Sequence, residues 1–298
     1  MNIAIVTDST CDLPVDVVKR LGITVVPCYI NMDGKSFLDG VDITREEFYR
    51  RLPDSHPHPT TSAPGTGTFL EVYNRLADQG AQGIISIHVS QSLSNVNNVA
   101  ILAARGFERI PVKVIDSGQL TLGVGLLVES AAEMAQQGLP LDEIELQVIA
   151  KRQRAYSYAR LSTLEYLRRS GRLSHLGQGL ASMLDIKPIM KMNDGTAQME
   201  MVRTRKRADD RVVELARGLA NIEKIGFVHA NAEADVKLLV ERIQPFLPEG
   251  VTGYISDVTP VIGAHVGPGA ICVSAIAGTR TEEHPSTMEK IVNKLRSI

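Results

Sequence analysis

Short apolar runs that end in polar residues and lead into helical stripes constrain the fold of this chain more than any other feature. Two of these runs stop at an Asp-Ser pair, Asp8-Ser9 in one case and Asp116-Ser117 in the other. Apolar residues then recur at helical spacing. This alternation predicts parallel strands joined by crossover helices, a Rossmann-like α/β architecture. The clearest strand runs are Ile3–Thr7, Ile84–Val89 and Val112–Ile115.

Local signals between these runs predict further elements. The apolar stretch Ile23–Ile30 predicts one strand, and the Asp33-Gly34 pair after it predicts a hairpin turn. Thr44 with Glu47 three residues later forms a capping box, which predicts a short helix to about residue 52. Residues 53–62 carry no periodic apolar signal, so we expect a loop there.

The pattern changes after residue 151. An Asn-Asp-Gly turn signal at residues 193–195 separates two strand-like runs, and further strands alternate with helices up to residue 276. Hairpins mixed with helices predict an α+β arrangement. Because 298 residues favour two domains over one, we expect a parallel-sheet N-terminal domain over residues 1–155 and an α+β C-terminal domain over residues 156–298.

Composition narrows the class of function. Net charge is −2, aromatic content is 4% and tryptophan is absent, so neither an electrostatic footprint nor stacking platforms for nucleic acid are expected. No run of about 20 apolar residues occurs, so no membrane-spanning segment is predicted. Three isolated cysteines, without a CxxC or Cys/His spacing, predict no metal site and suit a reducing cytoplasm.

Common catalytic signatures are missing from the sequence. There is no GxxxxGK[ST], GxSxG or HExxH motif, and no GxGxxG follows a strand. The GxG formed by Gly123 and Gly125 lies inside a helical pattern, where it favours helix packing over phosphate binding. The sequence therefore favours neither a nucleotide-dependent nor a metal-dependent enzyme, and no cofactor is expected.

Two hydroxyl-rich segments that lead into helices are candidate anion sites. Thr61 and Ser62 precede a helix expected from Pro64, and Ser94 stands where another helix begins. A helix N-terminus has unpaired N–H groups and favours an anion. One of Thr61 and Ser62 could be the N-cap, which leaves the other hydroxyl for a ligand. Since ligands bind beyond the carboxyl ends of parallel strands, we expect these segments and the two Asp-Ser pairs to converge on one rim.

A glycine-rich segment, residues 262–270, contains His265. The glycines allow close backbone approach and unusual dihedral angles. We therefore expect a loop that presents His265 to a ligand, although a lone histidine is more often a packed or surface residue.

Eight short motifs, in this order along the chain, resemble those of the DegV family over nearly its whole length. They are Val6-Thr7-Asp8-Ser9-Thr10 with Asp12-Leu13-Pro14; Thr61-Ser62-Ala63-Pro64; Leu93-Ser94; Ile115-Asp116-Ser117; Thr163-Leu164-Glu165-Tyr166-Leu167 leading into Gly171-Arg172-Leu173-Ser174; Ile186-Lys187-Pro188-Ile189; Val202-Arg203-Thr204; and His265-Val266-Gly267-Pro268-Gly269. The resemblance implies a two-domain carrier that is not itself an enzyme. It would enclose one long-chain fatty acid in a buried tunnel, with the carboxylate at the domain interface.

The resemblance also implies roles for individual residues. Thr61 and Ser94 match the family's carboxylate-binding positions, and His265 matches a histidine near the same head group; Ser62 belongs to the same candidate set. Arg172 and Arg203 match positions associated with docking a kinase or steadying an acyl phosphate. Some members present the acid to a separate ATP-dependent fatty acid kinase, whose acyl phosphate feeds phospholipid synthesis.

Two other functions stay open. The chain could be an acyl hydrolase or a phosphotransferase that uses Ser94 or His265, which requires a base within hydrogen-bond reach of the nucleophile. It could also resemble the substrate domain of a hydroxyacetone kinase and bind small trioses. Carrier chemistry is consistent with the residues, since hydroxyls and backbone N–H groups can pair a buried carboxylate without adding a titrating charge.

Overall fold

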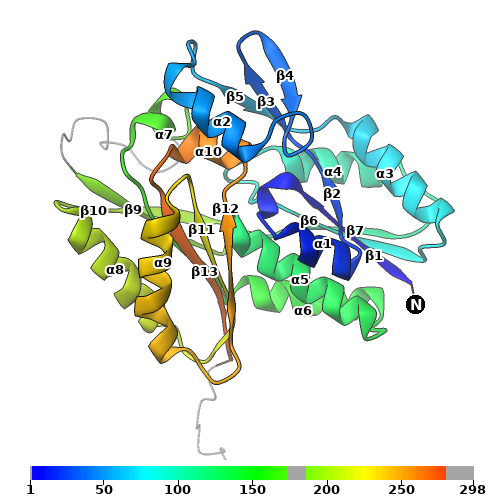
Figure 1. The fold of residues 1–298 in the computed structure, drawn as a ribbon. Helices are drawn as coiled ribbons and strands as arrows, with labels where there is room; N and C mark the ends of the chain where they lie inside the picture. The colour runs from blue at the N-terminus through cyan, green and yellow to red at the C-terminus, as the bar shows by residue number, and fades with distance from the viewer. Residues whose placement is uncertain (1, 174–185, 280–298) are drawn as a thin grey trace, which may run out of the picture.

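The structure is a computed structural model that describes residues 2–173 and 186–279 (Figure 1). Ser174, which belongs to one of the motifs, lies outside the described residues, and so do Leu184 and Asp185, where the strand-like run before the turn at residues 193–195 is expected to begin.

A four-stranded parallel sheet forms the first half of the chain, as the alternation of strands and helices predicts. The order is β2-β1-β6-β7. Helices α3 and α4 pack on one face, and α5 and α6 pack on the other, so the strands are shielded on both faces as parallel sheets require. The elements are β1 (Ile3–Asp8), α1 (Val15–Leu21), β2 (Thr24–Val26), α3 (Thr66–Asp78), β6 (Gly83–His88), α4 (Val96–Arg105), β7 (Val112–Asp116), α5 (Leu122–Gln136) and α6 (Leu141–Arg152).

A second, three-stranded antiparallel sheet, ordered β4-β3-β5, stands beside the first. The expected strand Ile23–Ile30 is wrong, because Pro27 separates β2 from β3 and the two belong to different sheets; proline has no N–H to give to a ladder. The expected loop is also wrong at its end, where three residues pair with β3. These elements are β3 (Tyr29–Met32), β4 (Lys35–Leu38), α2 (Arg45–Arg51) and β5 (Thr60–Ser62).

Two local predictions in this sheet are confirmed. Asp33 and Gly34 have φ angles of 53° and 73°, which is the backbone that a two-residue hairpin between β3 and β4 needs. The Thr44 side chain caps α2 by accepting from the Glu47 N–H at 3.1 Å. Short polar signals therefore identified the turn and the cap correctly.

The second half forms a six-stranded mixed sheet ordered β10-β9-β8-β13-β11-β12, in which only β11 and β12 pair in parallel. Helices α8 and α9 cover its outer face, and α5 lies against the other (Figure 1). The α+β prediction is confirmed. The elements are β8 (Ala155–Arg160), α7 (Glu165–Arg169), β9 (Lys187–Asn193), β10 (Thr196–Val202), α8 (Arg205–Arg217), β11 (Ile222–His229), α9 (Glu233–Ile243), β12 (Gly253–Asp257), α10 (Pro260–Val266) and β13 (Ile271–Ala277).

Helix α5 joins the two halves. Of its 15 residues 12 are buried, because one side packs on the parallel sheet and the other on the mixed sheet. A Cβ on Gly123 would lie 2.6 Å from the Ser157 hydroxyl, and one on Gly125 would lie 2.5 Å from the Cys11 carbonyl. The GxG is thus a packing feature, as its helical context indicates. The division at residue 155 stays a prediction, since α5 serves both sheets.

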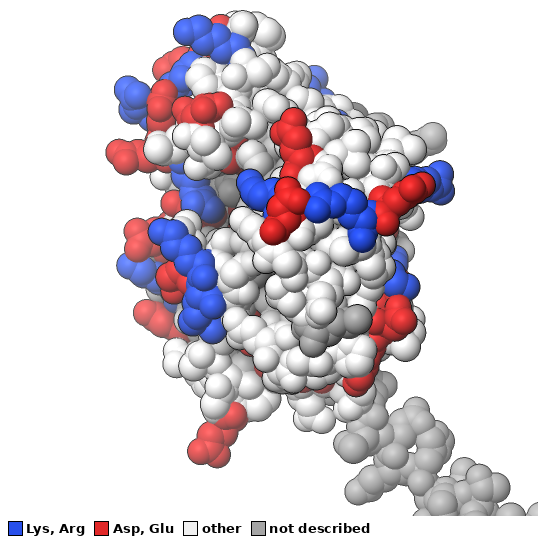
Figure 2. Space-filling model, turned by 90° about the vertical axis from the view of Figure 1, so that its right-hand side faces the viewer, with Lys and Arg blue, Asp and Glu red and all other residues white. Residues whose placement is uncertain are grey.

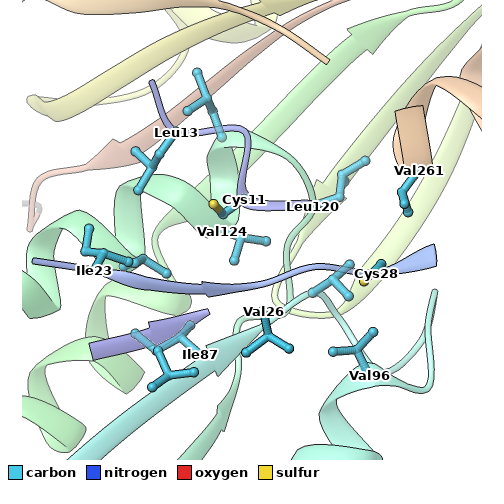
Figure 3. Close-up of a cluster of buried hydrophobic side chains, with 14 of the residues drawn as sticks. Cys11, Leu13, Ile23, Val26, Cys28, Ile87, Val96, Leu120, Val124 and Val261 are labelled. Carbon is cyan, nitrogen blue, oxygen red and sulfur yellow. The ribbon is translucent and has the colours of Figure 1, made fainter. Parts of the chain in front are cut away.

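The largest hydrophobic cluster continues from the parallel sheet into the region between the halves. Figure 3 shows Cys28, Val96, Leu120 and Val261, which come from four different parts of the chain, in the same cluster as the buried strand residue Ile87. The surface drawn in Figure 2 has positive and negative side chains lying side by side, in agreement with the interspersed charges of the sequence.

Candidate functional site

A cavity of about 230 Å³ lies where the parallel sheet, the small antiparallel sheet, α7 and α10 meet. Most of its wall is aliphatic, and the polar side chains are few. Such a space, greasy with a small number of placed polar groups, is typical of a site for a small organic ligand. Its polar lining consists of Thr10, Thr61, Ser62, Ser94, Asn95, Arg172 and His265.

The structure brings together five of the six site residues expected from the sequence. Thr61, Ser62, Ser94, Arg172 and His265 all line this cavity, although they come from four separate segments. Arg203 does not line the cavity. It is exposed, immediately before the residue that caps α8.

Neither Thr61 nor Ser62 is an N-cap, so that expectation is wrong. Helix α3 begins later, at Thr66, with Gly65 in the cap position and no side chain bonded to its first N–H groups. Thr61 instead lies in β5, opposite Ile30 of β3. Its Oγ1 lies 2.9 Å from Nε2 of His265, while Ser62 accepts a long hydrogen bond from Asn31. Both hydroxyls therefore belong to an edge strand rather than to a helix start.

Ser94 stands two residues before α4, in the turn that follows β6. The turn is closed by the Ser94 N–H, which donates to the Ser90 carbonyl at 3.1 Å. Among the described residues, its side-chain oxygen accepts only a long contact, 3.4 Å, from the Val96 N–H. The hydroxyl proton of Ser94 therefore remains available to a ligand oxygen in the cavity.

His265 lies in the last turn of α10, so the expectation of a loop is wrong. Pro260 opens this helix at its first position, where a missing N–H costs little. Gly263 lets the helix pack closely, since a Cβ there would meet the Tyr49 hydroxyl at 2.6 Å. Gly263 thus allows close packing inside the helix, while Gly267, with a φ of 69°, ends it.

The electrostatics of His265 favour its neutral form. Burial, then the positive charges of Arg172 and His58, lower the pKa of His265 from 6.5 to about 3. A neutral imidazole has one donor nitrogen and one acceptor nitrogen. Nε2 pairs with Thr61, and Nδ1 is buried with no hydrogen-bond partner among the described residues.

Beyond the polar end, the cavity borders a second, wholly apolar space of about 20 Å³. The two share Leu120, Met190, Ile262 and Val266 as a common wall. The smaller space reaches Cys272 in β13, deep between α10 and the mixed sheet. The polar end of the site is the part of the wall that carries Thr61, Ser94 and His265, and its apolar end is the aliphatic wall shared with the smaller space.

The predicted convergence of four polar segments holds only in part. The Asp116-Ser117 pair does not line the cavity; Asp116 accepts from the Gly118 and Gln91 N–H groups and so braces the edge of the sheet. Thr10, which does line the cavity, was not singled out as a site residue. Its position just beyond β1 was the available signal.

Two further findings concern the described residues as a whole. None of their helices combines the length and the apolar character needed to cross a bilayer. No group of three or more histidine, cysteine or acidic side chains among residues 2–173 and 186–279 is placed to hold a metal ion.

Comparison with known proteins gives a consistent result. The family model described as "Uncharacterised protein, DegV family" matches residues 2–278. A DegV domain-containing protein of Streptomyces coelicolor is 34% identical over 275 residues, which cover 91% of this chain and 97% of the relative.

Two solved structures are similar over nearly the whole fold. A DegV family protein from Thermus thermophilus, described for its fatty acid binding, is 30% identical with a TM-score of 0.84; it covers 93% of this chain and 100% of its own. DegV from Bacillus subtilis, described as a fatty acid binding protein, is 28% identical with a TM-score of 0.85 and the same coverage. This chain therefore belongs to the DegV family.

Proposed function

We propose that this protein binds one long-chain fatty acid in the cavity, with the carboxylate at Thr61, Ser94 and His265. The observation that carries the proposal is a single cavity whose lining combines hydroxyls and a neutral imidazole with mostly aliphatic side chains. The fatty-acid-binding description of two structurally similar relatives supports it.

The polar end suits a carboxylate. If Nε2 of His265 donates to the Thr61 oxygen, the Thr61 proton is free to bond a ligand oxygen, and Ser94 supplies a second proton. Arg172 adds a positive charge to the same wall. A buried carboxylate needs such partners, because an unpaired charge is costly to bury.

The apolar remainder suits an acyl tail. Each methylene removed from water contributes about 0.8 kcal/mol, so an aliphatic lining alone supplies a large favourable term. Leu120, Met190 and Val266 line both spaces, so a tail in the cavity would contact this apolar wall.

A carrier function is better supported than a hydrolase or a phosphotransferase function. A serine nucleophile needs a base within hydrogen-bond reach. Within the part of the chain that the structure describes, the Ser94 hydroxyl bonds to no histidine or carboxylate, and Nε2 of His265 is engaged by Thr61. We further propose that a separate fatty acid kinase performs phosphorylation and leads the acyl group toward phospholipid synthesis, with Arg172 and Arg203 facing that step.

A cytoplasmic setting completes the proposal. Cys11, Cys28 and Cys272 are buried free thiols, which suits a reducing compartment.

The test combines identification of the ligand with paired substitutions. We expect native mass spectrometry of freshly purified protein to show one bound acyl chain, and Thr61→Ala and Ser94→Ala to weaken fatty acid binding in a displacement titration. Thr60→Ala and Ser92→Ala are matched controls, since these neighbours are exposed and do not line the cavity. Unchanged affinity in both site variants, or a purified triose in place of lipid, would overturn the proposal.

A further inference from the structure

The loop after β1, residues 8–12, reaches the cavity through Thr10 alone. Three of its other side chains nevertheless bond close to the segments that carry Thr61, Ser94 and His265. Asp8 bonds to Val89 ahead of Ser94, Ser9 bonds to the hairpin that pairs with the strand of Thr61, and Asp12 bonds to Thr259 directly before the helix of His265. We propose that Asp8, Ser9 and Asp12 are positioning residues, each of which holds one segment of the head-group site. The inference rests on the proposed function, because it assigns these residues to the same site.

Asp8 holds the segment that carries Ser94. Its carboxylate is fully buried at the end of β1 and accepts from the Val89 N–H at 3.1 Å and from Nδ1 of His88 at 3.0 Å. Val89 lines the cavity and begins the turn that leads to Ser94. Asp8 also accepts from the Thr10 N–H at 3.0 Å, so one side chain ties the loop to the neighbouring strand end.

A chain of buried hydrogen bonds holds the His88 ring that donates to Asp8. The Tyr73 hydroxyl lies 3.0 Å from Ser86 Oγ, which lies 2.7 Å from Nε2 of His88. Burial alone would raise the pKa of Asp8, but the hydrogen bond and charge of His88 lower it below its usual range. An ionised Asp8 accepts only, and each donor that surrounds it is satisfied.

Ser9 holds the small sheet that carries Thr61. Its hydroxyl donates to Asp39 at 2.6 Å and accepts from the Cys28 N–H at 3.1 Å. Cys28 leads directly into β3, and β3 pairs with β5 so that Ile30 stands opposite Thr61. Both ends of the β3–β4 hairpin are therefore anchored to the loop by one hydroxyl.

Asp12 holds the helix that carries His265. One oxygen accepts from the Thr259 N–H at 2.8 Å, directly before α10, and the other accepts a short hydrogen bond from the Thr121 hydroxyl at the start of α5. Asp12 and Thr121 both have positive φ, 52° and 49°. Non-glycine residues adopt that backbone at a cost, and such strain persists where the surroundings hold it.

These contacts explain how groups far apart in the sequence share one site. Thr61, Ser94 and His265 lie in segments separated by long stretches of chain. Thr61 and Ser94 donate to the carboxylate and His265 orients the Thr61 hydroxyl, so all three must be held at fixed distances. Holding them before the ligand arrives avoids the cost of ordering them during binding. Losing one positioning side chain should therefore release one segment and its ligand group, not the whole site.

Double-mutant cycles test this assignment, with dissociation constants for a fatty acid measured at pH 8. The matched pairs are Asp8→Asn with Ser94→Ala, Ser9→Ala with Thr61→Ala, and Asp12→Asn with His265→Ala. Asparagine keeps the shape of aspartate but turns an amide donor toward donors. We expect each positioning variant to weaken binding about 3- to 30-fold, the range of one or two hydrogen bonds.

The test depends on whether the losses of affinity in each double-mutant cycle are independent or coupled. In a matched pair, the double variant should bind about as weakly as the single variant with the lower affinity, because the positioned group is already lost. In a crossed pair, such as Ser9→Ala with Ser94→Ala, the fold losses should multiply, since Thr61 and Ser94 share no hydrogen bond among the described residues, whereas Thr61 and His265 do. Matched pairs that multiply like crossed pairs would overturn the inference. Val148→Ala, a buried change on the distant helix α6, controls for general destabilisation and should leave affinity unchanged.

The outcomes separate this inference from the function. If Thr61→Ala, Ser94→Ala and His265→Ala fail to weaken binding, the proposed function is wrong. If they weaken it and the cycles are additive, only the positioning roles are wrong. Should an aspartate variant fail to fold, the Ser9 and Thr61 pair still decides, because serine to alanine removes one oxygen and introduces no new donor.

Discussion

The two ends of the cavity are built in opposite ways. At the polar end, Thr61, Ser94 and His265 come from three separate segments, and buried hydrogen bonds hold those segments in place. At the apolar end, side chains such as Leu120 and Met190 belong to the continuous hydrophobic cluster that also packs the fold. Binding at the polar end depends on the direction of hydrogen bonds, and binding at the apolar end depends on the volume of the side chains.

This difference predicts how each end responds to substitution. Hydrogen bonds weaken steeply when distance or angle changes, and a buried group left without a partner costs its full desolvation. Apolar burial has no preferred direction, and swaps that conserve volume are tolerated. The polar end should therefore be sensitive to single atoms, while the apolar end should respond to size.

The largest effect should come from a buried acid that supports the polar end. Burial raises the pKa of Asp39 from 3.8 to about 7. An acid whose pKa is raised on folding favours the folded state at low pH, and that contribution is lost as pH rises from about 4 to about 7. At about 1.4 kcal/mol per pKa unit, Asp39→Asn should raise the free energy of unfolding by about 2–4 kcal/mol at pH 8.

Urea unfolding at pH 8 and pH 4 measures this effect. The gain should nearly vanish at pH 4, where Asp39 is protonated in the folded protein. Asp54→Asn provides the matched control, since Asp54 is exposed in the short turn after α2. An equal increase in the free energy of unfolding at both pH values would show that ionisation of Asp39 does not destabilise the folded protein. The stability of the polar end would then be as independent of pH as that of the apolar end.

The next effect concerns a single oxygen atom at the polar end. Thr61→Val keeps the shape of the side chain but removes the hydroxyl that pairs with His265 at 2.9 Å. We expect fatty acid affinity to fall about 10- to 100-fold, because a ligand oxygen and His265 both lose a partner. Thr61→Ser, which keeps the oxygen, should bind within about fivefold of the native protein in the same titration. Equal losses in both variants would point to packing instead of hydrogen bonding.

A smaller effect is expected at the apolar end. Met190→Leu conserves volume in the wall between the two cavities and should change affinity less than about fivefold. Met192→Leu, on the same strand but away from the cavity, controls for repacking of the core. A loss as large as that of Thr61→Val would remove the contrast between the two ends.

The sequence predicted regular elements better than irregular ones. Strands β1, β6 and β7 carry short, mostly apolar runs that lead into helical stripes, so the parallel sheet followed from the pattern. Strand β5 has three residues and no alternation, and it exists only because β3 supplies a partner for its backbone. Helix α10 contains a glycine and a histidine, and its packing against Tyr49 has no local signal.

The candidate site shows the same division. Family resemblance placed Thr61, Ser94 and His265, and the structure brings them to one cavity. The resemblance could not show that Thr61 lies in a strand or that His265 lies in a helix, because both depend on contacts with distant segments. Thr10 and the bonds of the loop after β1 involve partners up to 247 residues away, which no local pattern reveals.

The smallest effect should come from outside the cavity. Arg203 is exposed and forms no ion pair with any described residue, whereas Arg172 lines the polar end and lowers the pKa of His265. Arg203→Ala should therefore change fatty acid affinity less than about twofold, as surface substitutions usually do, while Arg172→Ala should weaken it more. If a partner kinase docks at Arg203, the same variant should lower the rate of acyl phosphate formation when that kinase and ATP are added. A variant that binds fatty acid normally and supports a normal rate of acyl phosphate formation would remove Arg203 from the partner surface and leave the contrast between the two ends of the cavity intact.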